Sequence, residues 1–165
     1  KIEQSERTWL ERLADAVPGI AGYRAKEGRR DTDKNLREYL ARCLDDCVRR
    51  TEDARERHFE SKGMAGLDAF GRLLNALRAA ADSLRFASYG YSGFFDQIKV
   101  REGELGRLYE FDVSLLHEIR AIEAGCASLD AEKAKATAAQ IDALRSKIAA
   151  RKNIIEKITP APAGE

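Results

Sequence analysis

Over three long stretches of the chain, apolar residues recur mostly at spacings of three and four, and few helix-breaking residues interrupt them. Such spacing lines the apolar side chains along one face of an α-helix, as in heptad-repeat helices that pack together. The three lines are Leu67, Phe70, Leu74, Leu77, Ala81, Leu84 and Ser88; Leu105, Leu108, Asp112, Leu115, Ile119, Ile122, Cys126 and Leu129; and Ala134, Ala138, Ile141, Leu144, Ile148, Ile155 and Ile158. They predict helices over residues 67–88, 101–129 and 131–158.

Two more helices are expected before these. A long one begins near Asp31 or Asp33, either of which could cap it, and runs to about residue 62, ahead of Gly63. Its first half has an apolar stripe, whereas its second half, from Arg49, is mostly charged and is expected to be a solvated rod or to meet a polar partner. A short helix over residues 5–17 ends at Pro18 and leads into an irregular arm over residues 20–30.

Together these patterns predict an all-α fold. A chain of 165 residues is long enough for one domain with its own core. No segment alternates apolar and polar residues as a half-buried strand would. We therefore expect an antiparallel bundle of four long helices with a short N-terminal accessory helix. Residues 1–30 would form that helix and the arm packed on the bundle, residues 31–158 the bundle, and residues 159–165 a disordered tail.

Composition narrows the possible partners and compartment. The 29 Lys and Arg residues nearly balance the 28 Asp and Glu residues, so binding to nucleic acid or an anionic membrane surface would need a local basic patch. No apolar run reaches the roughly 18–20 residues of a membrane span. Three cysteines do not make a disulfide framework in a chain of this size. These features predict a cytoplasmic protein with free thiols.

Residues 85–100, here called the aromatic hinge, read RFASYGYSGFFDQIKV and concentrate five aromatic residues around two glycines. One interpretation is that the aromatic side chains plug one end of the bundle, which agrees with the rarity of large exposed apolar patches. The other is that Tyr89, Tyr91, Phe94 and Phe95 form a contact patch for a partner. In either case the hinge is expected to connect the helix over residues 67–88 to the helix over residues 101–129.

Motifs for metal or covalent chemistry are missing from the sequence. A carboxylate-bridged metal pair in a bundle requires Glu-x-x-His on two helices, and neither His58 nor His117 has that spacing. Cys43 and Cys47 share a helix face, and with Cys126 they could form a metal or redox site, but buried cysteines of this kind more often serve as small core residues. No nucleophile motif is present. We therefore predict no catalytic residues, metal or cofactor.

Asp112 interrupts an otherwise apolar line and needs a partner if it is buried. Arg151 or Lys152, which interrupt the apolar line of the last segment, are the candidates. The favoured interpretation is an ion pair that fixes the register of the helices. The alternative is that Asp112 marks a functional pocket.

The predicted function is a non-catalytic scaffold, adaptor or assembly subunit that associates with a protein partner or with itself. Its expected contact surface combines the arm with the aromatic hinge, through Tyr23, Arg24, Arg29, Arg30, Tyr89, Tyr91, Phe94 and Phe95. One alternative is a nucleic-acid-associated protein that uses Arg24, Lys26, Arg29, Arg30, Arg49 and Arg50, although interspersed acidic residues weaken it. Another is a small-ligand binder or enzyme with a pocket near Asp112 and the hinge tyrosines.

Overall fold

The structure, a computed structural model, describes residues 11, 14–18, 29–87 and 102–158. Four long helices, with a short 3-10 helix after the third of them, account for most of these residues: α2 (Arg29–Lys62), α3 (Leu67–Arg85), α4 (Glu102–Gly125), η3 (Cys126–Ser128) and α5 (Ala131–Ile158). The described part of the chain contains no strand, which confirms the predicted all-α class. None of the helices described is both long enough and apolar enough to cross a membrane.

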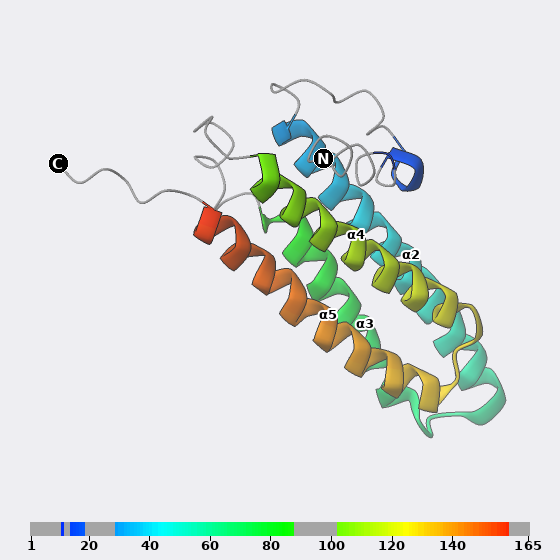
Figure 1. The fold of residues 1–165 in the computed structure, drawn as a ribbon. Coiled ribbons are helices and arrows are strands. Elements are labelled where there is room, and N and C mark those ends of the chain that lie inside the picture. The colour runs from blue at the N-terminus through cyan, green and yellow to red at the C-terminus, as the bar shows by residue number, and fades with distance from the viewer. Residues whose placement is uncertain (1–10, 12–13, 19–28, 88–101, 159–165) are drawn as a thin grey trace.

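The four helices form two hairpins that lie side by side (Figure 1). The turn between α2 and α3 and the turn between α4 and α5 lie at one end of the bundle, here called the turn end. The start of α2, the end of α3, the start of α4 and the end of α5 lie at the other, the open end. Consecutive helices are therefore antiparallel, as predicted. Because α2 and α5 each pack against both α3 and α4, α2 lies diagonally opposite α5.

The predicted apolar lines of α3, α4 and α5 meet in the core. Many of their large members are almost fully buried, including Leu77 and Leu84 of α3, Leu115 of α4 and Leu144 of α5. Each such side chain contributes roughly 1.5–3 kcal/mol when it is fully buried. Val17, which follows the helical residues 14–16, belongs to the same core. The aromatic hinge beyond residue 87 and the tail at residues 159–165 lie outside the described residues.

The second half of α2 differs from its prediction. Instead of a solvated rod, it packs along α3 and buries Thr51, Ala54 and His58. The hydroxyl of Thr51 donates to the carbonyl of Cys47 at 2.7 Å, so its polar group is satisfied within its own helix. The buried face of α2 thus continues through small and polar residues. The lack of leucine in this half does not mean that the face is exposed to solvent.

His58 joins this stripe to the turn between α2 and α3. Its Nε2–H donates to the carbonyl oxygen of Ala65 at 2.6 Å, because a carbonyl can only accept. The imidazole ring also packs against Phe70, with ring centroids 5.1 Å apart. His58 therefore holds the turn against the first turns of α3.

Other helix boundaries follow local capping. The helix predicted over residues 101–129 is α-helical only to Gly125 and continues as the 3-10 helix to Ser128. Asp130 caps α5, with its Oδ1 accepting a 2.8 Å hydrogen bond from the backbone N–H of Lys133. This backbone bond is the main reason that the pKa of the exposed Asp130 carboxyl lies below its usual value.

Both glycines of the turn between α2 and α3 have left-handed backbone conformations, with φ of 69° at Gly63 and 81° at Gly66. A Cβ at Gly63 would meet nothing within 4 Å, whereas one at Gly66 would lie 3.0 Å from the Cβ of Ala131. Gly66 therefore permits the two turns of the turn end to touch.

The two glycines should therefore differ in how well they tolerate substitution by alanine. Gly63→Ala is expected to lower the free energy of unfolding by about 1 kcal/mol, the strain of an alanine in left-handed geometry. Gly66→Ala has the same strain plus a steric clash, so its loss should reach about 2–3 kcal/mol. Urea unfolding followed by circular dichroism measures both. Equal losses would show that the contact with Ala131 is unimportant.

Candidate functional site

Most of the residues predicted to contact a partner lie outside the described part of the chain. These are Tyr23, Arg24, Lys26, Tyr89, Tyr91, Phe94 and Phe95. The backbone of Arg29 and Arg30 forms the first residues of α2, although their side chains are not described. The arm precedes α2 and the hinge begins at the end of α3, so both segments join the bundle at its open end (Figure 1).

In the structure Asp112 pairs with Arg151, one of the two partners that the sequence offered. Arg151 of α5 donates from Nε to Asp112 Oδ1 at 2.8 Å and from Nη2 to Oδ2 at 2.9 Å. The two side chains are 2% and 0% exposed. Lys152, the other candidate, has an exposed side chain. The ion-pair interpretation of Asp112 is thus confirmed, in the two-bond geometry that suits arginine and carboxylate.

Two further charged residues join this pair. Arg151 Nη2 lies 2.5 Å from Asp33 Oδ1, and Asp33 Oδ2 accepts a 2.8 Å bond from Arg37 Nε. Arg37 Nη1 in turn donates to the carbonyl oxygens of Leu84 at 2.9 Å and Arg85 at 3.3 Å, the last residues of α3. We call Asp33, Arg37, Asp112 and Arg151 the polar layer. It links all four long helices near the open end.

The polar layer also corrects two predicted boundaries. Asp31 or Asp33 was expected to cap α2, but the helix begins earlier, at Arg29, and the Asp33 carboxylate binds two guanidinium groups instead. The helix predicted to reach Ser88 ends at Arg85, where Arg37 binds the terminal carbonyl groups. The sequence did hold a signal for these residues, because the stripe through Leu36 and Leu40 extends back to Asp33 at the same spacing.

Within the layer, two carboxylates and two guanidinium groups sum to zero charge. Burial raises the pKa of Asp112, against the lowering effect of the Arg151 guanidinium. Burial also disfavours the charged form of Arg151, but Asp112 and Asp33 outweigh it and hold the pKa of Arg151 well above its usual value. Both oxygens of Asp112 are bonded to Arg151 and the side chain is 0% exposed. The geometry therefore favours a structural role over contact with a ligand.

The three cysteines lie in the core, none of them in a disulfide. Packing of η3 against α2 brings Cys126 to Cys47. Hydrogen bonding between the two thiols raises the pKa of Cys47 and lowers the pKa of Cys126. Burial raises the pKa of Cys43, which adjoins Tyr39. Among the residues described, no group of three or more His, Cys, Asp and Glu is placed to hold a metal ion.

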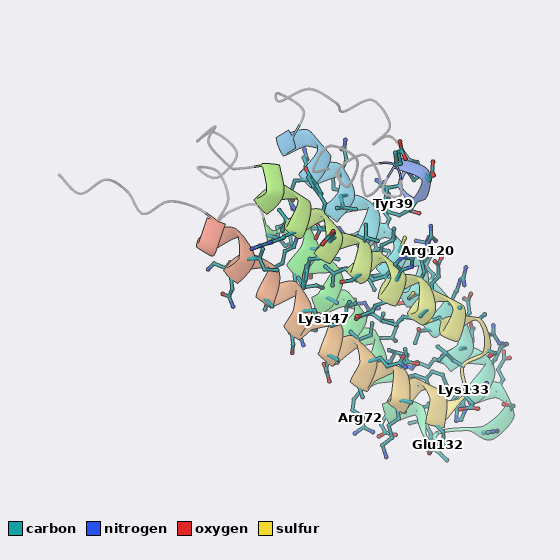
Figure 2. All side chains as sticks on the ribbon, in the orientation of Figure 1. Tyr39, Arg72, Arg120, Glu132, Lys133 and Lys147 are labelled. Carbon is teal, nitrogen blue, oxygen red and sulfur yellow. The ribbon has the colours of Figure 1, made fainter. Side chains whose placement is uncertain are left out.

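Acidic residues neutralise the basic residues of the middle of α2. Arg49 pairs with Asp46, and Arg50 lies 3.8 Å from the Glu123 carboxylate of α4. On the same face, Arg120 donates to the phenol oxygen of Tyr39 and its guanidinium lies 5.5 Å from the ring centroid (Figure 2). The nucleic-acid alternative needs a stripe of one sign of charge, and this face does not supply one.

Three large apolar side chains are exposed in the described part of the chain. Phe59 and Met64 are 52% and 75% exposed near the turn end, and Phe86 is 61% exposed at the open end. Phe86 borders a surface groove of about 600 Å³ between α3 and α5, which Ile148 and Lys152 also line.

Comparison with known proteins adds no family to this description. No family model, no curated protein and no solved structure matches the chain.

Proposed function

We propose that this chain is a non-catalytic helical scaffold or assembly subunit that associates with a protein partner, or with itself, through the open end of its bundle. The observation that carries the proposal is topological. Because α2 begins and α3 ends at this end, the arm and the aromatic hinge, which contain the predicted contact residues, both join the bundle there, and Phe86 of the hinge has an exposed side chain. Aromatic side chains in such positions commonly supply much of the energy of an interface.

The packed interior supports a role in protein association over a role in binding small molecules. Leucine and isoleucine side chains fill the centre of the bundle, and the polar layer engages both oxygens of Asp112. The groove beside Phe86 is an open surface feature, whose described lining does not include Asp112. The three buried cysteines, none of them in a disulfide, fit the reducing cytoplasm that we propose as the compartment.

The native mass of the full chain tests the proposal. We expect size-exclusion chromatography with light scattering to give at least twice the monomer mass at micromolar concentration, or a stoichiometric complex with a co-purifying protein. Phe86→Ser combined with Phe94→Ser should weaken the association at least tenfold, because each removes an aromatic contact of roughly 1–3 kcal/mol. Circular dichroism checks that the variant remains folded.

Phe59→Ser is the matched control, because it removes an exposed phenylalanine from near the turn end. It should leave the native mass unchanged. A chain that stays monomeric at all concentrations and captures no partner would contradict the proposal. If Phe59→Ser weakened the association as much as the double variant does, the assignment of the contact surface to the open end would be contradicted.

A further inference from the structure

A bundle of two hairpins has one structure only if the hairpins are fixed relative to each other along the bundle axis, that is, in one register. Within each hairpin the register follows from a short turn, residues 63–66 between α2 and α3 and residues 126–130 between α4 and α5. The connection between the hairpins, residues 86–101, is longer. At about 3.3 Å per extended residue, a connection of this length is compatible with several registers.

The apolar lines by themselves do not select among these registers. Their residues recur every seven positions, as Leu108, Leu115 and Ile122 do along α4. Sliding one hairpin by seven residues, about 10 Å, would therefore bring apolar side chains opposite apolar side chains again. Packing of the apolar lines alone would leave two registers of similar free energy.

The polar layer breaks this repeat. Arg151 of the second hairpin reaches across the centre of the bundle to Asp33 on the diagonally opposite helix, at 2.5 Å. Arg37 binds Asp33 and also the last carbonyl groups of α3, so the first hairpin presents one fixed docking point for the Arg151 guanidinium. In a shifted register Arg151 and Asp112 would face apolar side chains, and Asp33 would lose Arg151.

We propose that the polar layer sets the register between the two hairpins and does so without adding to the stability of the fold. Replacing buried ion pairs by apolar groups of similar size is often neutral or stabilising, and the best-attested benefit of such pairs is register. The other ion pair described between the hairpins, Arg50 with Glu123, is partly exposed and consequently weak. This inference does not rest on the proposed association.

A variant with an apolar layer tests the proposal. It combines Asp33→Leu, Arg37→Met, Asp112→Leu and Arg151→Met. Spin labels at two exposed positions, Asp53 on α2 and Ala139 on α5, report the axial offset by pulsed electron resonance. Genetically encoded labels avoid reaction at the native cysteines.

The native layer should give one narrow distance population. The apolar layer should give at least two, from registers offset by about 10 Å along the axis, with an unfolding midpoint in urea that is equal or higher. A single unchanged population would overturn the proposal. A variant that fails to fold, or that unfolds at lower urea, would overturn it too, since the layer would then be a source of stability.

Moving the layer provides a second, independent test. Asp112→Ile with Ile119→Asp shifts the carboxylate of the second hairpin by seven residues, and Leu144→Arg with Arg151→Leu shifts its guanidinium to match. Ile119 and Leu144 are fully buried and lie seven residues from the native pair in their own helices. The label distance should change to that of the hairpin slid by about 10 Å. Retention of the native distance would show that other contacts set the register.

Discussion

Arg151→Met is expected to lower the free energy of unfolding by about 3–5 kcal/mol. The substitution keeps most of the side-chain volume but removes the guanidinium that lies between two carboxylates. Asp112, which is 0% exposed, would lose both of its bonds to Arg151, and Asp33 would keep only Arg37. A buried charge without its partner is far less favourable than a buried apolar group. Urea unfolding followed by circular dichroism measures the loss.

Lys152→Met is the matched control, because it removes a positive charge from the neighbouring position, where the side chain is exposed. Its effect should stay within about 0.5 kcal/mol. Adding Asp112→Leu to Arg151→Met should restore part of the lost stability, since no unpaired carboxylate then remains at that position. Similar losses for the two single variants, or a further loss in the double variant, would show that the ion pair is not the source of the effect.

Phe70→Ala is expected to be the other severe substitution, with a loss of about 3–5 kcal/mol. The ring of Phe70 is 0% exposed in the core and packs against the imidazole of His58. Its removal would leave a cavity between α3 and the second half of α2. In that half, the residues that face α3 are small or polar, not leucine. The free energy of unfolding and its denaturant dependence measure the result.

Phe59→Ala tests whether this loss reflects burial rather than the removal of any phenylalanine. Phe59 lies one residue beyond His58 but is 52% exposed. We expect its substitution to change the free energy of unfolding by at most about 1 kcal/mol. If both substitutions had the same effect, α2 would not bury its inner face against α3 in solution.

The helices of the bundle were predictable because their signal is local. Alternating spacings of three and four follow from the geometry of one helix, and α5 begins and ends at the residues that the spacing indicated. The pairing of Asp112 was also predictable, since a carboxylate within an apolar line requires a partner and α5 offered two candidates. That Arg151 is the partner, and not Lys152, follows only from the side of the helix that faces α4.

The amino-acid pattern by itself determined the fold class, the existence of the four long helices, the bounds of α5 and the need for a buried ion pair. The tertiary structure decided that Asp33 and Arg37 complete this pair, that α2 lies diagonally opposite α5, and that Cys47 meets Cys126. The reason is physical. Helical periodicity is a property of neighbouring residues in one segment, whereas a contact between segments depends on how the hairpins dock. Burial likewise depends on the neighbouring helix, so Thr51 and His58 lie inside because their polar atoms find partners there.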